Sequence, residues 1–417
     1  MRLKYFCLGL VLLTAPAAHA SGFDAGPQGA RLLGLGGAGT AYTGSLAAFG
    51  GNAALLGQWA DTVQRTHLSF GGTGVLRRAS FVGLATNARA DQDLTVLPTG
   101  YLYASRAVGK KLVLGLALTT PYGYHTRWAD QWEGRAVVQE SRLNTYFVQP
   151  TAAFRLTDNF SVGAGLVYAY GKFSQRRALG QYDDPAAQAR FGGTGAGLGG
   201  TLGLYGRTGD NLSFGLSYRT GLKLKINSGT AEYANVPARD AALYPASTSL
   251  STALNLPSVL AIGIANRINQ KVLLTFDFAL TGWSTLDSLN YDLAAAAPAP
   301  ARRVADGRKL EDALAFRLGA ELRATPALTV LAGLRYDETP VRDEYIRPDF
   351  VDANRLGASL GLAYQLAPRL ALEAAYSFEY GQLRTARPDI SDGRVSNVGG
   401  SYRTATNTVS VGVATSF

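Results

Sequence analysis

Cysteine, methionine, charge and long apolar runs are all scarce in this chain. Its 417 residues include one cysteine and one methionine, and 17% are charged, against about 25% in an average soluble protein. The only long apolar run stands at the extreme N-terminus, which excludes a bundle of membrane-spanning helices of about 20 residues each. What remains is a large all-β chain or a soluble α/β enzyme.

Glycine, tyrosine and phenylalanine are abundant instead. The chain has 49 glycines, 21 tyrosines and 17 phenylalanines, and 47% of its residues are hydrophobic. Such a composition is neither disordered nor collagen-like. The formal net charge of +10 comes from scattered cations, so no nucleic acid is expected as a partner.

The N-terminus is typical of a secretory signal peptide. Arg2 and Lys4 form a basic start, residues 5–14 are apolar, and residues 18–20 read Ala-His-Ala, a typical cleavage site. The apolar stretch is too short for a membrane anchor, which is the alternative. Cleavage after residue 20 also removes the sole cysteine, Cys7, so the mature chain has no thiol or disulfide chemistry. An exported, tyrosine-rich chain without cysteine points to the envelope of a Gram-negative cell.

Apolar residues alternate with small or polar residues in runs of about ten from residue 97 onward. Residues 112–118 place four leucines on one face, and residues 370–380 place Leu370, Leu372 and three aromatic side chains on one face. A period of two over this length predicts strands. The other face carries mostly Gly, Ala, Ser and Thr, which favours a transmembrane barrel with strands of about 9–11 residues. A soluble sandwich or lipocalin-like barrel is the alternative.

The connections alternate between short and long. Turns such as 108–110 and 156–159 are short, whereas the long polar segments are 123–135, 174–197, 227–251, 290–312, 338–354 and 381–403. Outer-membrane barrels have short periplasmic turns and long extracellular loops. Counting strands, with one pair between about 63 and 106, predicts an all-β fold: a 14-stranded antiparallel transmembrane β-barrel.

Three divisions of the chain follow from this pattern. Residues 1–20 are the expected signal peptide, residues 21–62 do not alternate and are rich in small residues, and residues 63–417 form the barrel. Because small residues allow tight packing, we expect residues 21–62 to form an N-terminal hatch, or plug, inside the lumen. A flexible periplasmic extension is the alternative. The last strand ends on Phe417, which resembles the signal read by the barrel assembly machinery.

Motifs for cofactor and metal chemistry are weak. Two glycine patterns, at 34–39 and 195–200, lack the strand-turn-helix context of a dinucleotide site. After the signal peptide the only histidines are His67 and His125, so neither a metal site nor a cofactor is expected. A hydrolase built on His125 is the enzymatic alternative, but a loop histidine beside aromatic residues is more often a rim residue. We therefore expect no enzyme.

Several motifs, taken in order, resemble one family. They are Ser21-Gly22-Phe23, Gly34-Leu35-Gly36 leading to Leu55, Thr120-Pro121-Tyr122-Gly123, Trp132-Glu133-Gly134-Arg135, Leu254-Asn255-Leu256-Pro257, Thr281-Gly282-Trp283-Ser284 and Tyr336 to Val341. Their order and spacing resemble the FadL/TodX (OmpP1) family of outer-membrane transporters for long-chain fatty acids and other hydrophobic molecules. One departure is Ala53, where the family usually has a proline that fixes φ and removes a donor.

The resemblance implies a passive route. A hydrophobic molecule is captured among the extracellular loops, moves to a pocket in the barrel, and leaves sideways into the membrane after a hatch rearrangement at a kinked third strand. Phe23 is implied to insert into the interior pocket, and a monomer is implied. The gate residues that the resemblance suggests are Asn52, Ala53, Ala54, Leu55, Thr120, Pro121, Tyr122 and Gly123.

Candidate ligand contacts lie in segments 174–197 and 227–251. The apolar candidates there are Leu179, Tyr182, Phe191, Tyr233, Val236, Leu243 and Tyr244, and the alternative for each is a surface facing lipopolysaccharide. The candidate cations for a carboxylate are Lys172, Arg176, Arg308 and Lys309. Charged residues of lumen-facing parity are expected to form a network that holds the hatch: Arg317, Glu321, Arg335, Asp337, Glu373 and Glu379.

The expected partners are a long-chain fatty acid or an aromatic hydrocarbon, together with outer-membrane lipid and lipopolysaccharide. Two other functions remain open at this point. A general diffusion porin would have an open aqueous lumen, and a structural or adhesin barrel would hold no hydrophobic ligand.

Overall fold

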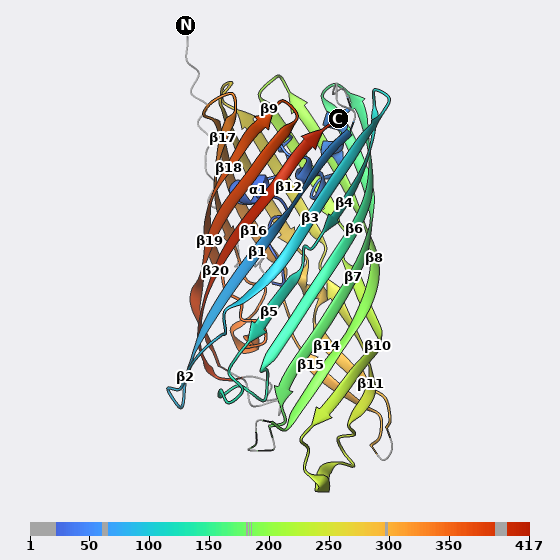
Figure 1. Ribbon diagram of the computed structural model, residues 1–417, viewed down its shortest axis with the longest axis vertical. Helices are drawn as coiled ribbons and strands as arrows, with labels where there is room; N and C mark the ends of the chain where they lie inside the picture. Colours follow the sequence, from blue (N-terminus) through green and yellow to red (C-terminus); the bar gives the residue numbers. More distant parts are fainter. Residues whose placement is uncertain are drawn as a thin grey trace.

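The computed structural model describes residues 22–60, 66–180, 182, 184, 186–296, 299–387 and 398–417. The expected signal peptide, residues 1–20, lies outside the described residues. The rest forms a closed antiparallel barrel of 14 wall strands (Figure 1), as predicted. The first strand pairs with its neighbour on one side and with the last strand on the other, which closes the wall.

Twenty strand segments build this wall, because several wall strands are interrupted. The segments are β1 (Thr66–Gly83), β2 (Arg89–Asp91), β3 (Thr95–Val108), β4 (Leu112–Thr119), β5 (Gly123–Arg127), β6 (Glu140–Thr157), β7 (Phe160–Ala178), β8 (Gln188–Thr208), β9 (Leu212–Arg219), β10 (Leu222–Ala234), β11 (Ser247–Leu256), β12 (Val259–Arg267), β13 (Val272–Thr281), β14 (Ser288–Leu293), β15 (Arg302–Gly307), β16 (Ala313–Arg323), β17 (Leu328–Asp337), β18 (Arg355–Ala367), β19 (Leu370–Ala386) and β20 (Gly400–Ser416). The helical turns are α1 (Ala30–Gly34), η1 (Leu46–Gly50), η2 (Ala53–Trp59), η3 (Ala238–Asp240), η4 (Trp283–Thr285) and η5 (Asp343–Tyr345).

Three neighbouring wall strands, β9/β10, β11/β12 and β13/β14, are interrupted at a matching level. The interruption between β4 and β5 lies apart from them, beyond β6, β7 and β8. β4 gives way to β5 at residues 120–122, β9 to β10 at 220–221, β11 to β12 at 257–258, and β13 to β14 at 282–287. Pro257 belongs to one of these breaks, and proline cannot donate to a strand ladder. The wall therefore changes course at a common level, beyond which β10, β11, β14 and β15 form a tall extension (Figure 1).

The two faces of the wall differ as the alternation predicted. On β19, Leu372, Tyr376 and Phe378 are exposed on the outside, whereas Glu373 and Glu379 are buried on the inside. The same division holds on β4, where Leu114 and its even-numbered neighbours are exposed. The exposed apolar face suits lipid, and the interior keeps its charges away from it.

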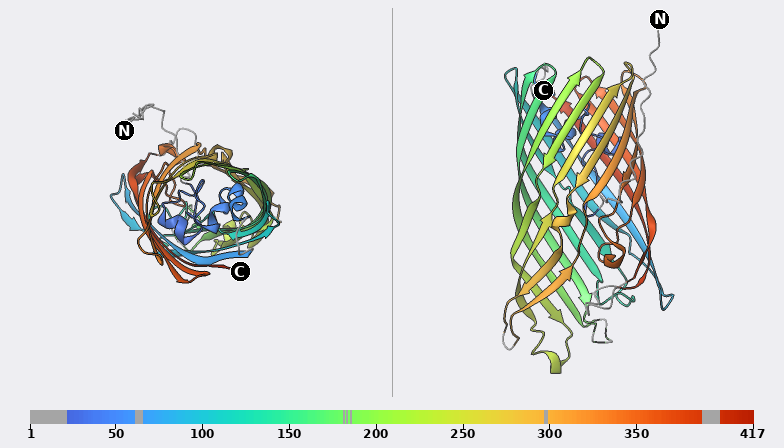
Figure 2. Two further views of the ribbon diagram at one scale, coloured as in Figure 1. Left: turned by 90° about the horizontal axis from the view of Figure 1, so that it is seen from above. Right: turned by 180° about the vertical axis from the view of Figure 1, so that it is seen from behind.

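Residues 22–60 lie inside the lumen, seen in blue from above in Figure 2. Arg31, in α1, is held by two wall carboxylates: its Nε lies 2.8 Å from Glu373 Oε1, and its Nη1 lies 3.7 Å from Glu321 Oε2. Tyr42 also donates to Glu321. The expected charge network that holds this segment is therefore confirmed for Glu321 and Glu373.

The other members of the network connect to one another on the same wall. Arg335 lies 2.5 Å from Asp337 and 3.1 Å from Glu379. Arg317 lies 3.9 Å from Asp337. Glu379 also pairs with Arg355 at 3.3 Å. Each buried charge thus faces an opposite charge, which offsets the cost of removing it from water.

Segments 174–197 and 227–251 are not long loops, contrary to the prediction. β7 continues to Ala178 and β8 begins at Gln188, while β10 continues to Ala234 and β11 begins at Ser247. The alternation is weak there because both faces of this extension are exposed to water or to protein rather than to lipid. The wall is therefore taller on this side, and the connections beyond it, residues 179–187 and 235–246, are shorter than predicted.

We predict that Arg31→Met loosens residues 22–60 from the wall. The substitution leaves Glu321 and Glu373 buried and without the guanidinium, and breaking a buried pair costs about 3–5 kcal/mol. Limited proteolysis of the refolded barrel should then cut within residues 22–60 at least tenfold faster than in the wild type. Arg78, which is exposed on β1, provides the control: Arg78→Met should leave the cleavage rate unchanged, and equal rates for both variants would contradict the prediction.

Candidate functional site

Phe23 is the centre of an aromatic cluster inside the extracellular half of the barrel. Its ring stacks on Tyr124 of β5 at 5.2 Å between centroids. It also contacts Trp283 of η4 at 5.5 Å and Phe350, which precedes β18, at 4.7 Å. All four side chains are buried. Three separate regions of the barrel therefore meet on one side chain of the N-terminal segment.

An apolar pocket surrounds this side chain. Its lining residues are Phe23, Tyr124, Leu143, Phe173, Ile226, Thr252, Leu254, Leu286, Leu289 and Arg308. The free space left is about 20 Å³, which is room for roughly one water molecule. The pocket is thus filled by the protein's own phenylalanine. An apolar ligand that replaced it would gain about 0.8 kcal/mol for each buried methylene group.

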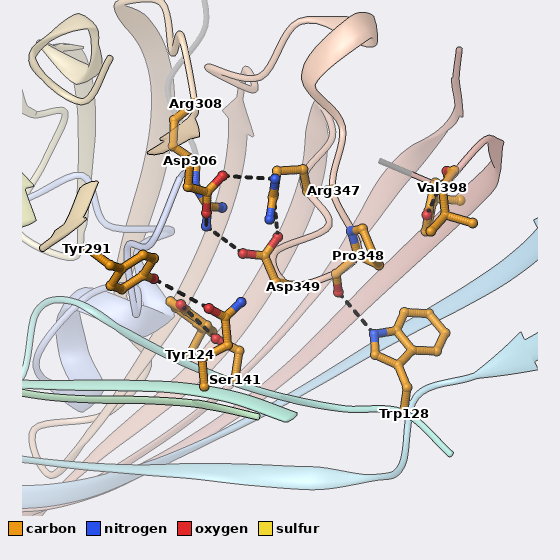
Figure 3. A network of polar contacts seen from close by, with 12 residues as sticks. Tyr124, Trp128, Ser141, Tyr291, Asp306, Arg308, Arg347, Pro348, Asp349 and Val398 are labelled. Atoms are coloured by element: carbon orange, nitrogen blue, oxygen red, sulfur yellow. Dashed lines mark hydrogen bonds and ion pairs between the residues drawn. The ribbon is translucent and has the colours of Figure 1, made fainter. Parts of the chain in front are cut away.

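Four buried charged side chains form a closed ring beside the pocket (Figure 3). Arg308 Nη2 lies 2.8 Å from Asp306 Oδ2 and 2.6 Å from Asp349 Oδ2. Arg347 completes the ring: its Nη1 lies 2.8 Å from Asp306 Oδ1, and its Nε lies 3.1 Å from Asp349 Oδ1. Positive and negative charges alternate, so the ring as a whole is neutral.

The ring shifts the pKa values of Asp349 and Arg308. Burial by itself raises the pKa of the Asp349 carboxyl, but the Arg308 and Arg347 guanidiniums outweigh burial and hold that pKa well below its usual range. Burial lowers the pKa of Arg308, yet Asp306 and Asp349 raise it well above its ordinary value. Arg308 is therefore matched by two carboxylates before any ligand arrives.

The backbone on either side of Phe23 is bonded to the interruption between β4 and β5. The amide of Ala25 donates to the carbonyl of Pro121 at 2.9 Å, and the amide of Gly123 donates to the carbonyl of Phe23 at 2.9 Å. The Thr145 hydroxyl donates to the Tyr122 carbonyl at 2.6 Å. The N-terminal segment thus supplies hydrogen-bond partners where the wall strand is broken.

A larger chamber lies on the other side of the aromatic cluster. It leaves about 200 Å³ of free space between residues 24–51 and the wall. Tyr122 and Trp283 line it, and their rings lie 6.0 Å apart. Arg219 also lines it and donates to the Tyr122 hydroxyl at 2.6 Å. Since Trp283 also contacts Phe23, these aromatic side chains separate the pocket from the chamber.

The comparisons with known proteins agree on one family. The family model described as "Outer membrane protein transport protein (OMPP1/FadL/TodX)" matches residues 11–417. The chain belongs to this family. It is an outer-membrane protein of the Gram-negative type.

Curated relatives of this OMPP1/FadL/TodX protein are distant. The long-chain fatty acid transport protein of Escherichia coli K12 is 22% identical over 386 residues, which cover 83% of this chain and 86% of that protein. A protein of the same name from Salmonella typhi is 24% identical over 292 residues, 64% of this chain and 66% of its own length. Outer membrane protein P1 of Haemophilus influenzae is 21% identical over 317 residues, 67% of this chain and 65% of its own length.

Solved structures share the fold. A FadL homologue of Pseudomonas aeruginosa has a TM-score of 0.80 and 20% identity, covering 95% of this chain and 100% of that one. The Pseudomonas putida toluene transporter TodX has a TM-score of 0.73 and 16% identity, covering 94% and 99%.

Most of the apolar side chains that were predicted to contact the ligand lie in one buried cluster. Four of them are buried in the cluster that contains Phe23, and two are partly buried against it; these are Leu179, Tyr182, Phe191, Tyr233, Val236 and Tyr244. Leu243 is exposed and stands apart. Phe191 and Tyr233 lie on β8 and β10, whereas the other four lie in the connections beyond these strands.

The candidate cations have different surroundings. Lys172, a candidate cation for a carboxylate, is exposed on β7 and shares the parity of outward-facing Tyr170. Arg176 pairs with Asp130 at 2.9 Å, and Lys309 lies over the ring of Tyr345 at 5.3 Å. Of the four, Arg308 alone lines the pocket that surrounds Phe23.

The two suggested gate segments do not meet. The Asn52 side chain donates to the carbonyls of Thr40 at 2.8 Å and Leu204 at 3.1 Å, so it is fixed to the β8 wall. A Cβ at Gly163 would clash with the backbone of Ala53, which shows how closely residues 52–55 pack against this wall. The partner of residues 120–123 is the backbone around Phe23 instead.

Several site residues were missed from the sequence. Trp283 belongs to a quoted motif, so that motif was the available signal. Asp306, Asp349 and Phe350 stand in polar segments without periodicity, which offers no signal. Within the stretch of chain that the structure describes, no three His, Cys, Asp or Glu residues are grouped as metal ligands. Among the same residues, no helix has the length and apolar character needed to cross a membrane.

We predict that Asp349→Asn destabilises the segment between β17 and β18. The ring would keep two guanidiniums with one carboxylate, and the loss of a buried partner costs about 3–5 kcal/mol. Hydrogen exchange of residues 338–354 should accelerate by more than a hundredfold. Asp343→Asn, in the same segment, removes an exposed partner of Arg384 and should change exchange little, because exposed pairs contribute about 0–1 kcal/mol.

The ring also predicts a pH dependence. Because the pKa of Asp349 is lowered in the folded protein, its contribution to stability is present above the ordinary carboxyl pKa of about 3.9 and is lost as the pH falls through the folded value. Exchange protection of residues 338–354 should therefore be constant between about pH 5 and pH 8 and decrease only in stronger acid. A transition near pH 6 would contradict this.

Proposed function

We propose that this chain carries hydrophobic small molecules across the outer membrane by passive diffusion, gated by residues 22–60 acting as a hatch, with sideways release into the membrane at residues 120–123. The ligands are long-chain fatty acids or aromatic hydrocarbons. The relatives support this choice, because one named relative is a long-chain fatty acid transporter and one solved relative is a toluene transporter.

One observation carries the proposal. The Phe23 side chain fills the apolar pocket, while its own backbone is hydrogen bonded to the broken wall strand at Gly123. A ligand that takes the place of the ring must shift the segment that covers the break. Ligand binding and opening of the wall are then one event.

The chamber beyond the aromatic cluster is the next position on the route. Its 200 Å³ of free space adjoins Tyr122, and residues 120–123 separate it from the outside of the barrel. A concentration gradient drives each step, so the transport needs neither a cofactor nor a catalytic residue. The position of residues 22–60 in the lumen (Figure 2) favours this function over a general diffusion porin or an adhesin barrel.

The outer surface of the barrel supports the remaining partners: lipid, lipopolysaccharide and the barrel assembly machinery. The exposed apolar face contacts lipid, and the tall extension stands at the level of lipopolysaccharide. Phe417 is exposed, and its backbone pairs with Thr66 at the closing seam of the barrel, with the Phe417 amide 2.9 Å from the Thr66 carbonyl. The barrel assembly machinery would read this end, and the protein works as a monomer.

We predict opposite effects of Phe23→Ala on binding and on uptake. Binding of toluene or oleate to the purified protein should strengthen about tenfold, because no side chain must leave the pocket. Cells that lack the gene are complemented with either the wild type or the variant. Uptake of the labelled compounds should be about tenfold lower with the variant, because the ligand no longer moves the segment over Gly123.

Phe49→Ala is the matched control, since Phe49 packs on Tyr103 at 5.4 Å at the other end of the N-terminal segment and does not line the pocket. It should leave ligand affinity unchanged. If deletion of the gene leaves the uptake of both oleate and toluene unchanged, the proposed function is wrong.

A further inference from the structure

The barrel wall has a second interruption, between β11 and the chain from Gly282 to β14. The β11–β14 ladder consists of the pairs Leu250 with Leu293 and Ser251 with Asp292. Toward the periplasmic end, pairing resumes between Val259 and Thr281, where β12 meets β13. Residues 252–257 and 282–291, all of which the structure describes, form no strand pairs with each other. We call this stretch the inlet seam.

The ladders on either side of the inlet seam are continuous. On one side, residues 222–226 of β10 pair in register with residues 252–256 of β11. On the other side, every residue of β14 pairs with β15, and the amides of Arg308 and Lys309 donate to the Asp287 carbonyl at 2.8 Å. The inlet seam is therefore a local gap in pairing between well-formed pieces of wall rather than a frayed end.

Side chains hold the inlet seam closed. The Thr252 hydroxyl donates to the Asn290 carbonyl at 2.8 Å, and the Asn255 amide donates to the Thr285 carbonyl at 2.8 Å. Between these two bonds lie Leu254, Leu286 and Leu289, all buried. Neutral hydrogen bonds and aliphatic contacts separate at much lower cost than a strand ladder does.

The inlet seam leads directly to Phe23. Thr252, Leu254, Leu286 and Leu289 are also lining residues of the pocket that Phe23 fills. One face of this pocket is thus made by the inlet seam itself. The one charged residue within the inlet seam is Asp287, which is exposed, so the buried way through suits an apolar molecule.

The outside of the inlet seam is polar. Polar residues flank it on both sides: Lys223 and Lys225 on β10, and Ser284, Thr285 and Asp287 opposite them. The two lysines are exposed. On the periplasmic side of the break, outward-facing Phe214, Leu216 and Tyr218 on β9 are apolar and exposed, as a lipid-facing wall requires. The inlet seam therefore opens outside the hydrocarbon layer, in the wall extension that faces the viewer in the right-hand view of Figure 2.

A ring of buried charge lies beside the pocket. Arg308, which lines the pocket, belongs to the closed ring of Asp306, Arg308, Arg347 and Asp349 (Figure 3), and Phe350, from the same segment as Asp349, packs on Phe23. A molecule that reached the pocket past this ring would have to separate buried ion pairs, whereas one arriving at the inlet seam would have to break two neutral hydrogen bonds and part three leucine side chains. The lower cost favours the side route.

We propose that the inlet seam is a lateral entrance through which uncharged hydrophobic molecules, or the apolar tails of amphiphiles, reach the Phe23 pocket from the lipopolysaccharide layer. This entrance rests on the proposed transport function. It lies across the lumen from residues 120–123, with Trp283 on the inlet side contacting Tyr122 on the other. Molecules enter through the inlet seam and leave at residues 120–123, with Phe23 between these two interruptions of the wall.

A reversible cross-link tests the entrance. The only cysteine of the chain is Cys7, in the expected signal peptide, so Asn255→Cys combined with Thr285→Cys places a single pair across the inlet seam. Oxidation should lower the initial rate of labelled toluene uptake about tenfold, and a reductant should restore it. The control pair, Lys225→Cys with Ala253→Cys, joins residues that are already paired in the β10–β11 ladder and should leave uptake unchanged.

The outcomes are distinguishable. If the cross-linked inlet seam and the cross-linked control take up toluene at the same rate as the reduced proteins, the lateral entrance is wrong while transport stands. If the wild type takes up no more than cells without the gene, the proposed function itself is wrong. Heat-modifiable gel mobility verifies that each variant has folded.

A second variant keeps the test independent of disulfide formation. Thr252→Val combined with Asn255→Ala removes both hydrogen bonds across the inlet seam and leaves its leucines in place. Toluene uptake should rise about threefold. An unchanged or lower rate in the folded variant would overturn the proposed entrance.

Discussion

Every backbone amide and carbonyl of a membrane-spanning wall needs a hydrogen-bond partner, and this constraint governs the whole molecule. The barrel meets it by closing β1 onto β20. Strand pairing is interrupted where other protein groups cover the unpaired backbone or where the wall extends beyond the lipid. At residues 120–123 the cover is the backbone around Phe23, and at the inlet seam it is the side chains of Thr252 and Asn255. The interruptions are thus the places where the wall can open without leaving bare backbone in hydrocarbon.

Much of the fold could be predicted from the sequence because a lipid-facing wall imposes a strict period of two. The exposed leucines of β4 and the inward glutamates of β19 follow that rule directly. The rule weakens where lipid ends, so the ends of β7, β8, β10 and β11 within residues 174–197 and 227–251 were predicted to be loops. Parity alone placed Glu321 and Glu373 in the lumen, whereas no sequence pattern indicated Arg31 as their partner.

The site was harder to predict than the wall, because its members come from separate connections. Asp306 and Asp349 lie far apart in the sequence, and no local pattern indicates that they share Arg308. Sequence reasoning therefore assigned Arg308 to a ligand's carboxylate, whereas the fold surrounds it with two carboxylates of its own. Residues 52–55 posed a different problem: the family resemblance suggested them as part of a gate, whereas their small side chains pack tightly against Gly163 of the wall.

In the proposed transport route, Phe23 resolves a conflict that any carrier of apolar molecules faces. An empty apolar pocket would bind a long chain too tightly to release it, since each buried methylene adds about 0.8 kcal/mol. A phenylalanine that occupies the same pocket competes with the ligand within the molecule, and the apparent affinity falls by the fraction of time the pocket is vacant. The competitor also returns when the ligand moves on, so it promotes release as well as weakening capture. Because the ring is tied through its own backbone to the broken strand at Gly123, its return would, under the proposed function, cover the wall again and close the barrel behind the molecule that has passed.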